Sequence, residues 1–195
     1  HLLVATNDND ILARFFATGT YARGEVHQTL SPAMDIQVAS NFERFLYYHF
    51  EQDSDRLVAF MQEFAANGAA SIGAPPDTQL MSSVAVNRAQ TLAAMHEVNT
   101  QFGYVLDPHT AVGYHAARNH LDHPDHRETP TDIVVVATAH PAKFPEAVEE
   151  ATGCEPTHPT LEALKGLTMH RQVLPCDIDA VKTYLVEQLH SEPRA

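Results

Sequence analysis

Asp107-Pro108-His109-Thr110-Ala111-Val112-Gly113 is the stretch from which the rest of the sequence is best interpreted. It follows the short apolar run 104–106 and begins a segment of helical composition that extends to Leu121. Asp107 is a favourable N-cap, and Pro108 suits the first helical position, where its missing N–H would have no intrahelical partner. Thr110 is then expected in the first turn, beside the positive end of the helix dipole, where a short hydroxyl side chain can face a ligand. From these residues alone, a well-capped helix without a ligand is the alternative.

Strand and helix patterns alternate along the chain, which predicts an α/β architecture. The clearest strand is Asp132–Thr138, whose consecutive apolar and β-branched residues are typical of a parallel strand covered on both faces. Helices are expected at 11–18, 87–102, 145–152 and 161–167. A final helix, capped by Asp177 or Asp179, is expected to end at Leu189. No internal repeat, low-complexity segment or linker divides the sequence, so we expect one α/β domain over residues 1–195.

A helical hairpin is predicted at about residues 41–67. Ser40 or Asn41 caps a first helix, and a second runs from Arg56 to Ala66 after the turn 52–54. Each helix places aromatic and aliphatic residues on one face: Phe42, Phe45, Leu46 and Phe50, then Leu57, Phe60, Met61 and Phe64. Aromatic stripes at this spacing are typical of a core. The segments 21–40 and 68–76 are expected to be loops.

The composition excludes several classes of protein. The formal net charge of −13 leaves no basic stripe for nucleic acid or an anionic membrane, and no apolar run reaches membrane-spanning length. Cys154 and Cys176 form no disulfide framework, so a cytoplasmic location is the default expectation.

The first residues suggest a truncated chain. The apolar run 2–5 has the composition of a buried strand, and domains rarely begin inside one. Asn9 or Asp8 is expected to cap the helix Ile11–Thr18, which Gly19 ends. A polar turn directly after a strand is also where open α/β sheets hold ligands.

Histidines raise the alternative of a metal-binding module. His115, His120, His123 and His126 lie near one predicted helix end. However, His115 and His120 are five residues apart, which turns their rings away from each other on a helix, whereas metal-binding helices of the protease type use a spacing of four. We therefore expect a solvated polar loop and no metal ligands. A non-catalytic interaction protein is the other alternative.

Five segments carry a resemblance to a known family: 4–12 (VATNDNDIL), 29–36 (TLSPAMDI), 40–44 (SNFER), 107–113 (DPHTAVG) and 137–144 (ATAHPAKF). In this order they resemble the C-terminal part of threonine synthase, in the branch found in many bacteria and fungi. The resemblance implies a pyridoxal 5'-phosphate (PLP) enzyme of fold type II, with a mostly parallel sheet flanked by helices. It also implies the conversion of O-phospho-L-homoserine and water to L-threonine and phosphate.

Two motifs of that family do not occur in this sequence. They are Ser-Phe-Lys-Asp, which carries the Schiff-base lysine, and Ser-Gly-Asn-Phe-Gly, which cradles the cofactor phosphate. Lys143, Lys165 and Lys182 lack that context, so no catalytic residue is assigned in this chain. Since the family places both motifs upstream of its C-terminal part, we expect the isolated chain to be inactive. We also expect that strands missing from the sheet would expose an edge through which the chain can self-associate.

The resemblance assigns site residues position by position. It implies that Thr110 offers its hydroxyl to the pyridine nitrogen of the cofactor, and that Asn7 and Asn9 border the cofactor. A neutral hydroxyl, unlike a carboxylate, does not force that nitrogen to stay protonated. The substrate is expected to be bound by Ser31, Asp35, Asn41 and Arg44.

Overall fold

The computed structural model describes residues 1–77, 80–123 and 132–190, which group into two compact units, 1–158 and 159–195. The second unit contains α7 (Pro159–Leu164) and α8 (Ile178–His190), and none of its described residues is buried. Of the two predicted caps of α8, Asp177 is the one whose carboxylate accepts a hydrogen bond from a backbone N–H, that of Ala180 at 2.8 Å. That residues 1–195 form a single domain stays a prediction.

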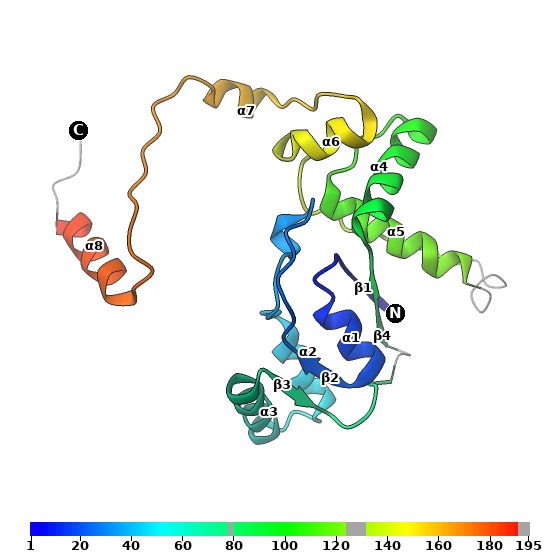
Figure 1. The fold of residues 1–195 in the computed structure, drawn as a ribbon, viewed down its shortest axis with the longest axis vertical. Helices are drawn as coiled ribbons and strands as arrows, with labels where there is room; N and C mark the ends of the chain where they lie inside the picture. Colours follow the sequence, from blue (N-terminus) through cyan, green and yellow to red (C-terminus); the bar gives the residue numbers. More distant parts are fainter. Residues whose placement is uncertain (78–79, 124–131, 191–195) are drawn as a thin grey trace. The chain divides into compact units, whose positions relative to one another are not determined.

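A parallel strand pair lies at the centre of the first unit (Figure 1). Strand β1 (Leu2–Thr6) pairs with β4 (Met81–Ala85) in the register Leu2 to Met81 through Thr6 to Ala85. Helices α1 (Ile11–Thr18) and α5 (Pro108–Asp122) both pack against this pair. On α5, Val112 and Ala116 are fully buried and form a small core with Leu3, Ala5 and Val84 of the strands. The predicted α/β class is confirmed.

Gly19 ends α1 in the left-handed conformation, with φ of 76°. A Cβ added here would lie 2.1 Å from the Ala74 carbonyl oxygen, so only glycine fits. The start of the helix differs from the prediction of an Asn9 or Asp8 cap. The N-cap position is Asp10, and its carboxylate pairs with Arg14 at 2.8 Å and caps no backbone N–H.

Two short strands were missed by the sequence analysis. Strand β2 (Thr20–Ala22) and strand β3 (Ala69–Ser71) form an antiparallel pair where loops were predicted. Three residues are too few to show the alternation by which a half-buried strand is detected. In the rest of the segment 21–40 the predicted loop is confirmed, with one 3-10 turn, η1 (Pro32–Met34).

The predicted helical hairpin is present as α2 (Phe42–His49) and α3 (Ser54–Asn67). With α1 and β2 it encloses a set of buried side chains that we call the aromatic core: Ile11, Phe15, Phe16, Tyr21, Phe42, Leu46, Phe50, Phe60, Phe64 and Ala70. The rings of Tyr21 and Phe42 stack with centroids 4.6 Å apart, and Phe15 meets Phe42 edge-on at 4.7 Å. Apolar area and ring packing therefore hold this part of the first unit together.

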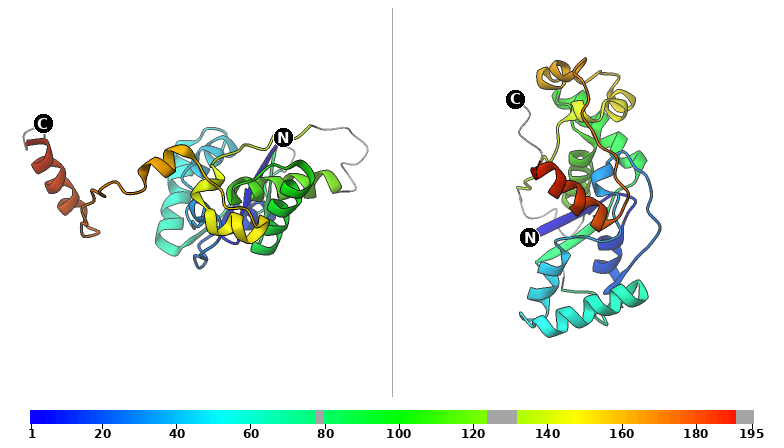
Figure 2. Two further views of the ribbon diagram at one scale, coloured as in Figure 1. Left: turned by 90° about the horizontal axis from the view of Figure 1, so that it is seen from above. Right: turned by 90° about the vertical axis from the view of Figure 1, so that its left-hand side faces the viewer.

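Helix α4 (Arg88–Phe102) lies beside α5, and α6 (Pro145–Thr152) packs against α4 (Figures 1 and 2). The start of α4 is a capping box, in which Asn87 and Gln90 bond each other's backbone N–H groups. Met95, Val98 and Val148 are buried between these helices, whereas Phe102 at the end of α4 is 68% exposed. The short helix η3 (Pro141–Lys143) precedes α6.

The predicted strand Asp132–Thr138 is wrong. The segment has no regular secondary structure, and Val134 and Val136 are 87% and 73% exposed. Its β-branched composition is real, but a strand also needs a neighbour whose backbone groups complete the ladder. No strand pairs with it in the part of the chain that the structure describes.

No helix within the described ranges is long and apolar enough to span a bilayer.

Candidate functional site

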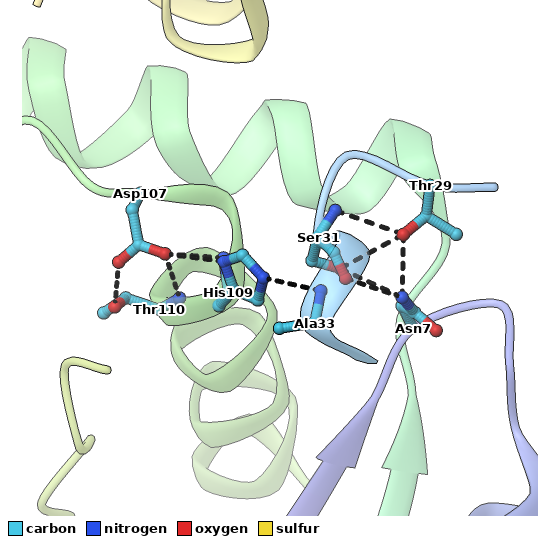
Figure 3. Close-up of polar contacts among 7 residues, drawn as sticks. All are labelled: Asn7, Thr29, Ser31, Ala33, Asp107, His109 and Thr110. Atoms are coloured by element: carbon cyan, nitrogen blue, oxygen red, sulfur yellow. Dashed lines mark hydrogen bonds and ion pairs between the residues drawn. The ribbon is translucent and has the colours of Figure 1, made fainter. Parts of the chain in front are cut away.

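Asp107 caps α5, as predicted, and does more than cap it (Figure 3). Its Oδ1 atom accepts hydrogen bonds from the backbone N–H groups of His109 (2.9 Å) and Thr110 (3.4 Å). The hydroxyl of Thr110 donates to the other oxygen, Oδ2. The carboxylate is almost fully buried, with 1% of the side chain exposed. A buried carboxylate needs such donors, because nothing else replaces the lost water.

The ring of His109 connects Asp107 to a distant loop. Its Nε2 atom accepts a hydrogen bond from the Ala33 N–H at 3.3 Å, and Nδ1 lies 3.0 Å from Asp107 Oδ1. Since a backbone N–H can only donate, Nε2 carries no proton, and Nδ1–H donates to the carboxylate. His109 is therefore held as the neutral Nδ1–H tautomer. The ring also packs against Phe144 at the beginning of α6, with centroids 4.7 Å apart.

Asn7 forms a second polar cluster at the end of β1. Its side-chain amide lies within hydrogen-bonding distance of Thr29 Oγ1 (2.7 Å) and Ser31 Oγ (3.0 Å), as Figure 3 shows. The same amide lies 2.7 Å from Asp35 Oδ1. Its carbonyl oxygen accepts from the backbone N–H of Asn9 at 2.8 Å. These bonds fix the segment 29–35 against the end of the strand.

Asn9 holds the neighbouring part of the same loop. Its amide donates to the His27 carbonyl (2.8 Å) and to Asp35 Oδ1 (3.1 Å), and its oxygen accepts from the His27 N–H (2.9 Å). Asn7 and Asn9 are each 2% exposed. Their polar atoms are engaged within the protein, which explains why Asn9 is not available as a cap for α1.

We call these two clusters together the polar junction: Asn7, Asn9, Thr29, Ser31, Asp35, Asp107, His109 and Thr110. The backbone of Ala33 joins its two halves through His109, as Figure 3 shows. Beside it, a cleft of ≈ 350 Å³ is lined by Thr29, Leu30, Pro32, Lys143, Phe144 and Pro145. The junction therefore brings the end of β1, the loop 27–37 and the first turn of α5 to one place.

Five of the seven predicted site residues belong to the polar junction: Thr110, Asn7, Asn9, Ser31 and Asp35. The other two, Asn41 and Arg44, are exposed at the start of α2. Asn41 is at the N-cap position but makes no side-chain cap bond. For Arg44, no ion pair is found among the described residues. Their assignment to the substrate stays a prediction.

Thr29 and His109 were not singled out from the sequence. Thr29 lies in the segment 29–36 and His109 in the segment 107–113, and for His109 the sequence held a usable signal. It is the second residue after a capping aspartate, at a position whose backbone N–H bonds the cap carboxylate, so its side chain starts close to that carboxylate. What spacing does not reveal is the partner of its second nitrogen, because Ala33 lies 76 residues away.

The histidine-based alternative has no support in the described residues, among which no group of three or more His, Cys, Asp or Glu side chains is positioned to hold a metal ion. His120 instead stacks on His1, with ring centroids 5.5 Å apart. His126 lies outside the described residues.

Comparisons with known proteins point to one family. A family model described as "Threonine synthase, C-terminal" matches residues 110–185. Threonine synthase of Pseudomonas aeruginosa is 42% identical over 153 residues, and that of Methylobacillus glycogenes is 37% identical over 203 residues. These matches cover 77% and 96% of this chain, but only 32% and 40% of the relatives.

A solved structure gives the same result for the fold. The PLP-bound threonine synthase of Brucella melitensis superposes with a TM-score of 0.81 at 36% identity, covering 98% of this chain and 41% of that one. The chain thus spans about two fifths of the length of this solved structure, and two fifths or less of the length of the two curated relatives. Family model, relatives and fold together show that this chain belongs to the threonine synthase family and corresponds to its C-terminal part.

Proposed function

We propose that the chain is the C-terminal part of a PLP-dependent threonine synthase, which converts O-phospho-L-homoserine and water to L-threonine and phosphate. The observation that carries the proposal is the buried hydroxyl of Thr110 in the first turn of α5, held by Asp107. The PLP-bound relative from Brucella melitensis, similar over 98% of this chain, supports the same cofactor here.

The residues around Thr110 fit a pyridine ring nitrogen, which needs one hydrogen-bonding partner. In the structure the Thr110 hydroxyl donates to Asp107. A hydroxyl can also turn its one proton toward a ring nitrogen, or accept through its lone pairs from a protonated one. When bound, PLP supplies an electron sink for the proton transfers that eliminate phosphate and add water. The chain's own contribution is to orient and enclose the ring.

We assign the remaining residues to positions around that ring. Thr110 bonds the ring nitrogen, while Asp107 and His109 hold Thr110 and exclude water from it. Asn7 and Asn9 border the cofactor by fixing the loop 27–37, which keeps Ser31 and Asp35 on the substrate side.

Asn41 and Arg44 complete the proposed substrate site. A guanidinium binds a carboxylate or phosphate through two parallel hydrogen bonds, and O-phospho-L-homoserine carries both groups. The exposed position of Arg44, without an ion pair among the described residues, agrees with a role toward a ligand.

The proposal extends to the chain's behaviour in isolation. Without the family's lysine motif, we expect no threonine formation until an upstream part is supplied. We place the protein in the cytoplasm, with a small-molecule substrate and with neither nucleic acid nor membrane as a partner. An incomplete sheet edge at β1 and β4 makes self-association of the isolated chain an expectation.

The test is Thr110→Val in the parent protein, meaning this chain together with the residues encoded upstream of it. Valine keeps the shape and removes the hydroxyl, so we expect turnover to fall about 10- to 100-fold, as for the loss of a charge-assisted bond of roughly 1.5–3 kcal/mol. The absorbance of the bound coenzyme should change with it. Thr110→Ser keeps the hydroxyl and is the matched control. Unchanged absorbance and turnover in Thr110→Val would refute the assignment.

A further inference from the structure

A cavity of ≈ 160 Å³ lies in the first unit, between the end of β1, the start of α1 and the segment 33–39. Most of its wall is apolar and comes from six side chains: Ile11, Leu12, Ala33, Met34, Ile36 and Ala39. Ile36 also remains 44% exposed, so the cavity opens to solvent beside this side chain. Apolar cavities of about 150 Å³ are large enough for a benzene ring. The wall therefore accepts a small apolar body.

Thr6 contributes a polar atom to this cavity. Side chains alternate along a strand, and Leu3 of β1 packs toward α5, so Thr6 points to the opposite face, where α1 begins. The residue is 7% exposed, and its Oγ1 atom is buried without a hydrogen-bond partner among residues 1–77, 80–123 and 132–190. A buried hydroxyl without a partner is costly, and a bound group that completes the hydrogen bond recovers that cost.

The wall of the cavity is unsuited to a charged ligand. Within the described structure, none of the residues that line it has an ionisable side chain. Asn9, the other polar residue of the wall, has its amide already bonded to His27 and Asp35. Moving a charge into such surroundings without a counter-charge is costly, which excludes carboxylates, phosphates and amino-acid zwitterions. PLP and O-phospho-L-homoserine both carry phosphate, so neither is the ligand of this cavity.

We propose that this cavity is a binding site for a small uncharged molecule that has an apolar body of about six carbon atoms and one hydrogen-bonding group. The apolar body lies against Leu12, Met34 and Ile36, and the Thr6 hydroxyl bonds the polar group. A hydroxyl can donate to a carbonyl oxygen or share a hydrogen bond with an alcohol or a phenol, so all three classes satisfy Thr6. Phenol is a simple member of this class, and toluene has nearly the same shape without the hydroxyl.

The experiment uses the parent protein, to which phenol and toluene are added separately in a titration calorimeter. Thr6→Val keeps the shape of the side chain and removes its hydroxyl. We expect the preference for phenol, measured as the Kd of toluene divided by the Kd of phenol, to fall about 5-fold in Thr6→Val. The backbone amide signals of Thr6, Leu12 and Ala33 should shift when phenol is added to the wild type, which places the bound molecule in this cavity.

Thr20→Val is the matched control. Thr20 also lies in a strand, β2, but its hydroxyl is 3.3 Å from Ser71 Oγ, and it does not line the cavity. Its loss should leave the preference for phenol unchanged. Ala33→Leu adds bulk to the cavity wall at an exposed position and should weaken the binding of both molecules, because it fills part of the space.

Three results would overturn the proposal. If the wild type binds neither molecule, the cavity is closed or is filled by a side chain of the upstream part. If the preference for phenol is unchanged in Thr6→Val, the Thr6 hydroxyl does not bind the polar group. If Thr6→Val lowers the unfolding temperature, the hydroxyl is already bonded within the protein, since a hydroxyl without a partner contributes no stability. None of these measurements needs bound PLP or turnover, so the proposed function can fail while this inference stands, and the reverse.

Discussion

The aromatic core and the polar junction are adjacent in sequence, since α1 begins a few residues after Asn7, yet they are built in opposite ways. The core consists of rings and aliphatic side chains that bury area without directional requirements. The junction consists of amides, hydroxyls and carboxylates whose donors and acceptors are matched atom by atom. Apolar area gives stability that tolerates rearrangement, whereas a satisfied polar network fixes positions and is sensitive to a single lost atom. We therefore expect substitutions in the core to act mainly on global stability and substitutions in the junction mainly on local geometry.

The largest effect is expected from Phe15→Ala. Phe15 is completely buried and meets the rings of Phe16, Tyr21 and Phe42. Removing it leaves a cavity that should lower the free energy of unfolding by about 3–5 kcal/mol, measured by urea denaturation. Phe102→Ala, at a position 68% exposed, is the control and should change it by less than about 0.5 kcal/mol. Equal costs would show that the aromatic core does not dominate stability.

A smaller but more local effect is expected from Asn7→Ala. It removes the donor shared by Thr29, Ser31 and Asp35, at about 1–3 kcal/mol. Amide hydrogen exchange should quicken at Thr29, whose N–H bonds Asp35 Oδ2, more than in the aromatic core.

The control for Asn7 is Asn41→Ala, which removes an exposed amide that makes no cap bond. It should alter neither stability nor exchange at Thr29. If Asn7→Ala also left the exchange of Thr29 unchanged, the junction would not be what positions this loop.

The smallest effect concerns Tyr21, the polar atom inside the aromatic core. Its hydroxyl accepts from the Ala39 N–H at 2.8 Å, so Tyr21→Phe should cost about 0.5–1.5 kcal/mol near neutral pH. Burial raises the pKa of the Tyr21 phenol above its ordinary value of 10.0, and nearby Glu43 acts in the same direction. The Ala39 hydrogen bond and Arg23 oppose this shift.

The sign of the pH dependence follows from the raised pKa. The unfolded chain ionises at about pH 10, before the folded state does, so stability is retained below that pH and lost as the pH rises through the folded pKa. Unfolding titrations between pH 8 and 11 should show a shallower alkaline loss in Tyr21→Phe. Tyr48→Phe, at a position 65% exposed, should keep the slope of the wild type. A Tyr21→Phe slope equal to that of the wild type would contradict the assignment.

Local interactions made much of the fold predictable. The cap at Asp107, Pro108 at the first helical position, the stop at Gly19 and the hairpin at 41–67 all depend on residues within a few positions of one another. The same holds for Thr110 in the first turn of α5. These features follow from the sequence alone, because the hydrogen bonds and the helical period that produce them span at most about one turn.

Tertiary structure decided what depends on distant partners. Asp132–Thr138 has the composition of a strand but no neighbour to pair with in the described chain, and the short strands β2 and β3 exist because each pairs with the other. Asn9 bonds His27 and Asp35 and so does not cap α1. His109 finds Ala33 across 76 residues. Sequence supplies the donors and acceptors, but packing selects which of them meet, because a hydrogen bond forms only when the fold brings both atoms within about 3 Å.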